Sequence, residues 1–341
     1  METAKKSTTE TKSNQLAKSE ILFLYESTYS IPNGDPFTGE QRYDEETKRV
    51  LVSDVRIKRF IRDYFLEQNN GQHEIYVWND ISQAEGKESG SAARMKALKE
   101  KYKDDDSIKV EKKKNEKVID AVKLLQKCID VRLFGGISTE EKDAVNLTGP
   151  VQFGLLNPSL NEVDLRMHQN TSVFVSSVEK TRGAIGTTTV VPYCVNQIHG
   201  WINPYSAKHT GLAETDVSLM FKALWESINS ANTRTKSNQN SLLLLQIVYS
   251  EPTKKLYGLD RLINLTPKDN KRGEQLRSIA DFEFDFSNLI DTIKSDAVTE
   301  IKYYCDIKGI EDKIKDKPEK DKSKFKKMDF SENKQENEDS K

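Results

Sequence analysis

Residues 241–249, SLLLLQIVY, restrict the fold of this chain more than any other stretch of its sequence. Nearly every residue is apolar, whereas a strand with one face in water alternates apolar and polar residues. The run is also far shorter than the roughly 20 residues that a membrane-spanning helix needs. We therefore predict a strand that is buried on both faces, inside a sheet with structure packed against either side.

Other elements can be placed around this strand from their periodicity. In chain order they are a strand at residues 21–27, a helix after an N-cap at Ser53, strands at residues 73–78, 163–175 and 190–201, and a helix capped by Thr215. The elements thus follow the order strand, helix, strands, helix, strand. This is the split βαβ order of ferredoxin-like and RNA-recognition-motif folds. We predict an α+β fold of this kind, with large insertions.

Composition suggests that part of the chain lies outside one compact core. Of the 341 residues, 35% are hydrophobic and 31% are charged, which is poor for a single core of this size. We expect a disordered arm at residues 1–19, a core at 20–307 that carries a charged, partly helical insertion at 80–116, and a disordered charged tail at 308–341.

The net charge and the cysteines indicate where in the cell this protein resides and what kinds of molecule it can bind. The formal net charge is −1, so any site for an anion must be local. The start of the chain lacks the apolar region of a signal peptide, and no run is long enough to span a bilayer. The three cysteines are far apart and odd in number, which suggests reduced thiols in a cytoplasmic protein with no membrane partner.

No familiar enzyme motif occurs in the sequence. A phosphate-binding P-loop, a Gly-x-Gly-x-x-Gly turn, a His-Glu-x-x-His pair and a Cys-x-x-Cys pair are all missing. The four histidines share no metal-ligand spacing. We therefore expect no enzyme activity, no metal and no cofactor. Asp35, before a proline, could be a catalytic carboxylate, although a turn explains it without any catalytic role.

The helix after Ser53 carries the first candidate binding site. Four basic residues lie on the side of this helix away from its apolar stripe: Arg56, Lys58, Arg59 and Arg62. One acidic residue, Asp54, lies on the same side. Cations in the first turns of a helix oppose its dipole, whereas a bound phosphate there is favoured. The cluster can therefore be read either as a solvated helix face or as a site for an anionic partner.

A second candidate is the polar stretch RMHQNT at residues 166–171 together with RGAIGT at residues 182–187. Glycines allow close backbone approach, and Arg166, His168, Gln169 and Arg182 could contact phosphate and sugar. The alternative is a polar loop that ties two strands together. The aromatic signature of RNA-recognition motifs is missing, so base stacking on the sheet is not expected.

Five motifs occur in a fixed order: NGDP at residues 33–36, VSDVRIKR at 52–59, DVRLFGG at 130–136, TGPVQF at 148–153 and the Arg182–Gly loop. Together they resemble the backbone subunit of CRISPR Cascade complexes, a RAMP-type family, in its type I-B branch. The resemblance implies a modified RNA-recognition-motif core with a hand-like shape and a thumb. It also implies that Ser53, Lys58 and Arg59, at the start of the helix, contact RNA.

The resulting hypothesis is a non-catalytic, guide-RNA-binding backbone subunit of a Cascade surveillance complex. Its partners would be the guide (CRISPR) RNA, target DNA that pairs with the guide, head-to-tail copies of itself and other Cascade subunits. Two alternatives stay open: a metal-dependent ribonuclease of the type III backbone kind that uses Asp35, and a free-standing single-strand-binding protein. The expected RNA-binding residues are Ser53, Arg56, Lys58, Arg59, Arg166, His168, Gln169 and Arg182.

Overall fold

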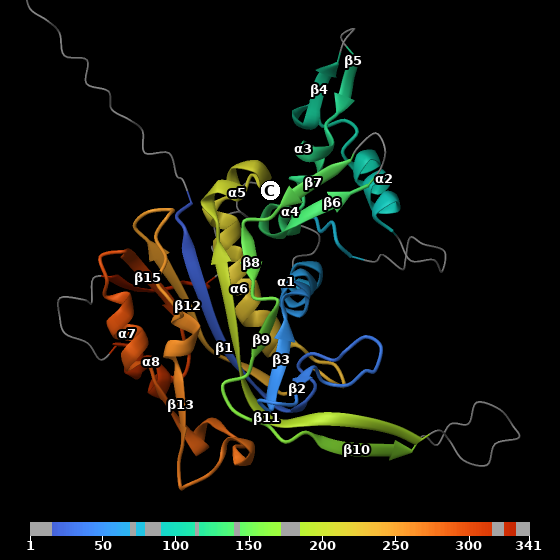
Figure 1. Cartoon of the computed structure of the whole chain (residues 1–341). Coiled ribbons are helices and arrows are strands. Elements are labelled where there is room, and N and C mark those ends of the chain that lie inside the picture. The colour runs from blue at the N-terminus through green and yellow to red at the C-terminus, as the bar shows by residue number, and fades with distance from the viewer. Residues whose placement is uncertain are drawn as a thin grey trace, which may run out of the picture.

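A computed structural model describes residues 16–68, 73–78, 90–112, 116–139, 144–171, 185–315 and 324–331. The fold is a mixed α/β arrangement around one large sheet (Figure 1). Its strands follow the order β10–β11–β1–β12–β15–β16, and β8 pairs with β11 beside this path. Among these residues, no helix is long and apolar enough to cross a membrane.

The strands of the large sheet are β1 (Ser19–Ser30), β8 (Val151–Phe153), β10 (Arg166–Thr171), β11 (Ile185–Ile202), β12 (Gln239–Tyr249), β15 (Val298–Tyr304) and β16 (Phe325–Lys327). β1 lies at the centre and is antiparallel to both β11 and β12. Every residue of β12 except Asn240 is buried. The prediction of a strand covered on both faces is therefore confirmed.

Two long helices, α1 (Asp54–Gln68) and α6 (Glu214–Ser230), cover one face of the sheet. Side chains at alternate positions of β1, such as Phe23 and Tyr25, pack with the apolar stripes of these helices. The stripes expected from the sequence are buried: Ile57, Phe60, Ile61 and Phe65 on α1, and Val217, Met220, Phe221, Leu224, Trp225 and Ile228 on α6.

The other face of the sheet is covered by the C-terminal part of the chain. Leu22 and Leu24 of β1 point to this side and pack with buried residues between Leu259 and Ile314. The elements here are β13 (Asn264–Pro267), β14 (Phe282–Asp285), α7 (Ser287–Ile293) and α8 (Lys308–Lys315), with short 3-10 turns between them. The sheet is thus the middle of three layers.

A smaller unit with its own apolar cluster lies beyond the end of α1 (Figure 1). It contains α2 (Ser91–Lys101), β4 (Lys109–Lys112), β5 (Glu116–Ile119), α3 (Ala121–Leu125), α4 (Ile129–Phe134), β6 (Gly135–Ser138) and β7 (Val145–Thr148). The strand expected at residues 73–78 is not formed. The Asp130 carboxylate accepts the backbone N–H groups of Tyr76 and Val77 at 2.8 and 3.0 Å, so these groups are not available to a strand.

Three features around β1 and β11 prepare the candidate site. β2 (Tyr43–Asp44), β3 (Arg49–Ser53) and β9 (Leu156–Pro158) form a small sheet that leads into α1. α5 (Pro204–Thr210) follows the end of β11. The first part of β11 pairs with β10 only, and the second part pairs with β1. The β10–β11 hairpin therefore projects from the sheet (Figure 1).

The C-terminal segment is more ordered than its composition suggests. α8 packs Ile310 and Ile314 onto the sheet, β16 pairs with β15 in parallel, and Met328 and Phe330 contact the core on the helix side. For these described residues the expectation of a disordered tail is wrong, because a few apolar side chains anchor an otherwise charged segment. Residues 1–15 of the expected arm and residues 316–323 and 332–341 of the expected tail lie outside the described residues.

Candidate nucleic-acid interface

The turn at residues 33–36 is joined to the start of α1 by one side chain. Asn33 Oδ1 accepts the backbone N–H of Ser53 at 2.6 Å and the Ser53 hydroxyl at 2.7 Å. Both residues are buried, and the backbone N–H of Asn33 donates to Gln41 Oε1 at 2.9 Å. The Ser53 hydroxyl is therefore used inside the protein, where it fixes the point at which α1 begins.

Asp35 is also used within its own turn. Its Oδ1 accepts the backbone N–H of Phe37 at 2.9 Å, and its Oδ2 lies 3.2 Å from an Nη of Arg42. The hydrogen bond from Phe37 lowers the pKa of the Asp35 carboxyl. Within the described ranges, no three His, Cys, Asp or Glu side chains are grouped as a metal site would require.

The basic residues of α1 separate into two flanks. On the inner flank, Lys58 Nζ donates to Asp54 Oδ2 at 2.9 Å and to Gln152 Oε1 at 3.2 Å. Arg62 Nε donates to the buried Asp130 carboxylate at 2.9 Å. Only 13% of each of these two basic side chains is exposed. Both charges are therefore neutralised inside the protein, and their main effect is to join α1 to its neighbours.

The outer flank carries Arg56 and Arg59, which are neighbours because they lie three residues apart on the helix. Arg59 Nε pairs with Asp63 at 2.6 Å, and 57% of the Arg59 side chain is exposed. Arg56 lies over the ring of Phe60, with 3.7 Å from its Cζ to the ring centroid. In the described part of the chain no carboxylate lies within 4.0 Å of Arg56, and burial lowers the pKa of its guanidinium.

Lys236 adds a cation to the outer flank from a distant part of the sequence. It lies in the loop between α6 and β12. In this loop, the carbonyl oxygen of Thr235 accepts the backbone N–H of Ile31 at 2.9 Å. Lys236 Nζ donates to the Ile31 carbonyl oxygen. Burial, followed by the charge of Arg56, lowers the pKa of Lys236 to about 8. The sequence reasoning missed this residue, although TRTK at residues 233–236 is a basic stretch before the most apolar strand.

The β10–β11 hairpin carries three of the other expected residues. Arg166, His168 and Gln169 are all exposed on β10. Arg166 and His168 share one face, and Gln169 lies on the other. His168 pairs with Thr188, whose Oγ1 lies 3.5 Å from an Nη of Arg234 in the loop that holds Lys236. This loop thus connects the outer flank of α1 with one face of the hairpin. Arg182 lies outside the described residues.

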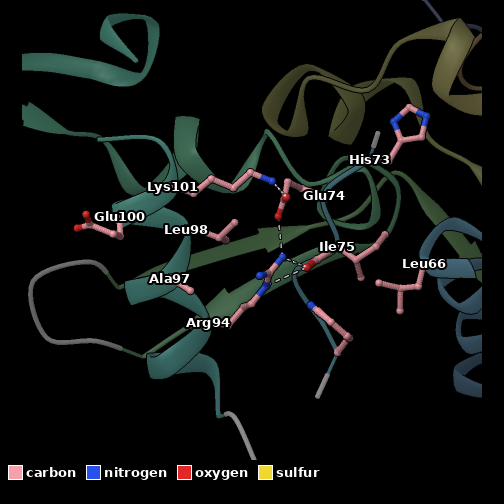
Figure 2. Close-up of a pocket in the computed structure, with 10 residues that line it drawn as sticks. Leu66, His73, Glu74, Ile75, Arg94, Ala97, Leu98, Glu100 and Lys101 are labelled. Atoms are coloured by element: carbon pink, nitrogen blue, oxygen red, sulfur yellow. Dashed lines mark hydrogen bonds and ion pairs between the residues drawn. The ribbon is translucent and has the colours of Figure 1, made fainter. Parts of the chain in front are cut away.

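An open pocket of about 680 Å³ lies elsewhere, between α1, residues 73–78 and α2. Figure 2 shows Arg94 reaching the Ile75 carbonyl oxygen and the Glu74 carboxylate, while Lys101 reaches Glu74 from the other side. Glu74 thus pairs with both cations, and Glu100 adds a second negative charge to the pocket lining. The charges of this pocket do not favour an anionic ligand, in contrast to the outer flank of α1.

The chain is similar to known proteins over most of its length. The family model described as "CRISPR-associated protein Cas7" matches residues 17–287. The CRISPR-associated protein Cas7 of Haloferax volcanii is 28% identical over 300 residues, which cover 82% of this chain and 83% of that protein.

Two solved structures have a similar chain. One is described as "CRISPR RNA-guided surveillance complex, pre-nicking"; its chain is 12% identical with a TM-score of 0.47, and the match covers 85% of this chain and 93% of that one. In another "CRISPR RNA-guided surveillance complex" the chain is 13% identical with a TM-score of 0.45, covering 85% and 90%.

Proposed function

Since its residues 17–287 match the model of the CRISPR-associated protein Cas7 family, the chain belongs to that family, and on this premise we propose that it is a guide-RNA-binding backbone subunit of a Cascade surveillance complex. In this role it holds RNA without cutting it. Copies of the chain stack head to tail along the guide, beside other Cascade subunits, and leave guide bases free to pair with target DNA. The order of the five sequence motifs supports assignment to the type I-B branch.

The arrangement of the sheet supports a modified RNA-recognition-motif core. β8, β11, β1 and β12 lie side by side in that order, and all three pairings are antiparallel. With α1 after β1 and α6 after β11, this is the strand order of a split βαβ fold. In this reading, the projecting β10–β11 hairpin is the thumb of a hand-like subunit, and the unit around α2 and β4–β5 is an insertion.

The observation that carries the proposal is the outer flank of α1. Arg56 and Arg59 stand beside each other at the start of a helix, and Arg56 has no carboxylate partner among the described residues. A guanidinium group held in place by an aromatic ring is prepared to bind a phosphate. Phosphate contacts position nucleic acid without reading its sequence, as a holder of many different guides requires.

The contacts that we propose are Arg56, Arg59, Arg166, His168 and Gln169, with Arg182 as a further candidate. Ser53 and Lys58 have a different part in this proposal. Because the Ser53 hydroxyl bonds Asn33 and the Lys58 ammonium bonds Asp54, these two residues place the helix that carries the contacts.

Purification without nuclease treatment, followed by sequencing of the bound nucleic acid, tests the function directly. A guide holder should retain RNA of one length with varied central sequence. RNA of mixed lengths would instead indicate a free-standing single-strand-binding protein, and the absence of RNA would count against both.

A matched pair of variants tests the interface. Arg59→Met and Lys58→Met each remove one positive charge from neighbouring positions of α1. We expect Arg59→Met to weaken binding of every RNA sequence alike and to reduce the salt slope by about 0.7, the value for one phosphate contact on a single strand. Lys58→Met should keep the slope and lower thermal stability. The opposite pattern would show that the inner flank holds the RNA.

A further inference from the structure

The most apolar strand of the chain contains one buried glutamine. Gln246 interrupts the apolar residues at 242–249 of β12, and only 4% of it is exposed. It pairs with Ile21 of β1 on one side and with Lys302 of β15 on the other. A strand that is covered on both faces favours hydrocarbon side chains, so this amide needs an explanation from its surroundings.

The side-chain amide of Gln246 has only one of its two ends paired. Its Nε2 donates to the Ser19 hydroxyl at 2.9 Å, whereas its Oε1 is buried and has no hydrogen-bond partner among the described residues. Buried polar atoms are rarely left without a partner. A group that can hydrogen-bond to this amide is therefore missing.

A cavity of about 190 Å³ lies beside this amide, which forms part of its lining. The apolar walls of the cavity come from α6 and the C-terminal segment, and they are Val217, Phe221, Met328 and Phe330. Lys302 and Glu214 also line the cavity, and they pair with each other at 2.8 Å. A second carboxylate, that of Asp329, is close to them in the lining. The one cation is thus already paired, and the lining does not favour an anionic ligand.

These features define the chemistry of a ligand. Apolar walls disfavour filling by water, because a buried water needs several polar partners. An apolar cavity of about 150 Å³ holds a benzene ring, so this cavity has room for one substituted ring. The rings of Phe221 and Phe330 favour an aromatic body. A phenol hydroxyl both donates and accepts hydrogen bonds, so it matches the free end of the Gln246 amide.

We propose that this cavity binds a neutral phenol group. Its ring lies between α6 and the C-terminal segment, and its hydroxyl donates to Gln246 Oε1. The phenol can belong to a free small molecule or to a tyrosine side chain of another protein, since both offer the same group. The site lies on α6, the sheet and the C-terminal segment, and it is separate from the outer flank of α1.

The first test compares p-cresol with toluene, which has the same ring and methyl group but no hydroxyl. Saturation-transfer NMR titrations measure the affinity of each probe for the full-length protein freed of nucleic acid. We expect p-cresol to bind the wild type about tenfold more tightly than toluene, because toluene leaves Gln246 Oε1 buried without a donor. Gln246→Leu should lose this preference. Gln126→Leu, which changes an amide at the protein surface, should keep it.

A second variant tests the place of binding without changing Gln246. Ser218 lines the cavity and is exposed on α6, so Ser218→Phe should block the cavity while the fold is kept. The affinity for p-cresol should fall at least about tenfold, because the added ring takes the space of the ligand. Ser287→Phe is the matched control, since Ser287 is exposed on α7 and away from the cavity. It should bind p-cresol as the wild type does.

N-acetyltyrosinamide and N-acetylphenylalaninamide separate the two sources of the phenol. If the ligand is a tyrosine of another protein, the first compound should compete with p-cresol and the second should not. Competition by neither compound identifies a free phenol as the ligand.

Three results would overturn the proposal. They are equal binding of p-cresol and toluene by the wild type, equal competition by the two blocked amino acids, and wild-type affinity for p-cresol in folded Ser218→Phe. None of them bears on the guide-holding role, which the retention of RNA during purification tests separately.

Discussion

The Asn33 side-chain oxygen accepts two hydrogen bonds from Ser53, one from its backbone N–H at 2.6 Å and one from its hydroxyl at 2.7 Å. These two residues lie near the two ends of the segment that joins β1 to α1 and contains β2 and β3. A single buried amide therefore fixes where the turn ends and where the helix begins. The position of α1 in turn sets the direction of its outer flank, so this junction links the turn sequence to the proposed interface.

Replacing Asn33 should destabilise the fold. Asn33→Ala leaves the N–H and hydroxyl of Ser53 buried without an acceptor, and each such group costs about 1–3 kcal/mol. We expect a loss of at least about 2 kcal/mol in the free energy of unfolding, measured by urea denaturation. Ser53→Ala removes only one of the two hydrogen bonds, so it should lose clearly less. Equal losses in the two variants would contradict the assigned role of Asn33.

Asp35 should act as a turn residue and not as a nuclease residue. Its carboxylate is held by the backbone N–H of Phe37 and by Arg42, and Asp35→Asn keeps an acceptor oxygen for the first of these contacts. We expect guide-bound wild type and Asp35→Asn to leave a complementary RNA intact with magnesium or manganese present. The melting temperature of Asp35→Asn should stay close to that of the wild type, because the ion pair that it removes is near the surface. Regularly spaced RNA fragments from wild type alone, with RNA binding kept in Asp35→Asn, would establish the ribonuclease.

The central elements could be predicted because their local patterns and their burial agree. The apolar residues of α1 and α6 repeat at helical spacing, and each stripe meets the same face of the sheet. β12 is apolar throughout because both of its faces are covered. The segment at residues 73–78 has similar composition but forms no strand, since Asp130, distant in sequence, takes its backbone N–H groups. Such a contact between residues far apart in the chain cannot be predicted from the local sequence.

The motifs that carried the family resemblance contain many structural residues. A Cβ atom on Gly135 would lie 2.1 Å from the Leu147 carbonyl oxygen, and one on Gly149 would lie 1.9 Å from the Phe134 carbonyl carbon. Both glycines are therefore needed where two backbones touch. Arg132, in the same motif as Gly135, makes a two-point ion pair with Asp216 at 2.7 and 2.8 Å. Motif order thus identified the family more directly than it identified the interface.

The candidate site was only partly predictable for a related reason. From the sequence alone, the four basic residues of α1 cannot be told apart; they are Arg56, Lys58, Arg59 and Arg62. The inner flank is distinguished from the outer one only by tertiary contacts, those of Lys58 with Gln152 and of Arg62 with Asp130. Lys236 joins Arg56 because the α6–β12 loop returns to the end of β1. That meeting depends on the sheet order, which hydrophobic periodicity does not determine.

Lys236 should make stability depend on pH. Its folded pKa, about 8, lies below the ordinary value of 10.5, so the charged form is disfavoured in the folded state. This destabilising effect is fully present below pH 8 and fades as the pH rises through the window from about 8 to 10.5, where only the unfolded state still binds the proton. Relative to Lys236→Met, the free energy of unfolding of nucleic-acid-free protein should therefore rise across that window.

RNA that lies along the proposed outer flank of α1 should reverse this shift, because a phosphate group near Lys236 favours the ammonium form. At pH 8 the wild type should take up a fraction of a proton when RNA binds. Titration calorimetry in two buffers of different ionisation enthalpy measures this uptake. Lys236→Arg keeps the charge but does not titrate in this range, so its uptake should be absent. Equal uptake in both proteins would show that Lys236 is not the titrating group.

The C-terminal segment should contribute to stability despite its charge. β16 adds a short parallel strand beside β15, and the ring of Phe330 stacks on Tyr304 with centroids 4.2 Å apart. The backbone N–H of Met328 donates to the Tyr303 carbonyl oxygen at 2.7 Å. Deleting residues 324–341 exposes this apolar surface, so we expect the melting temperature to fall by several degrees, because about 1 kcal/mol corresponds to 2–4 °C in domains of 150–250 residues.

Two smaller changes locate this contribution. Phe330→Ala should reproduce much of the loss, about 1–2 kcal/mol for a half-buried aromatic side chain. Deleting only residues 332–341, a stretch with no large apolar side chain, should leave the melting temperature at the wild-type value, because such composition buries little apolar area. RNA affinity should be unchanged in all three variants, since the segment packs on α6 and β15 and not on the outer flank of α1. If calorimetry gave the 324–341 deletion the same melting temperature as wild type, the packing of Phe330 and Met328 would contribute nothing to the fold.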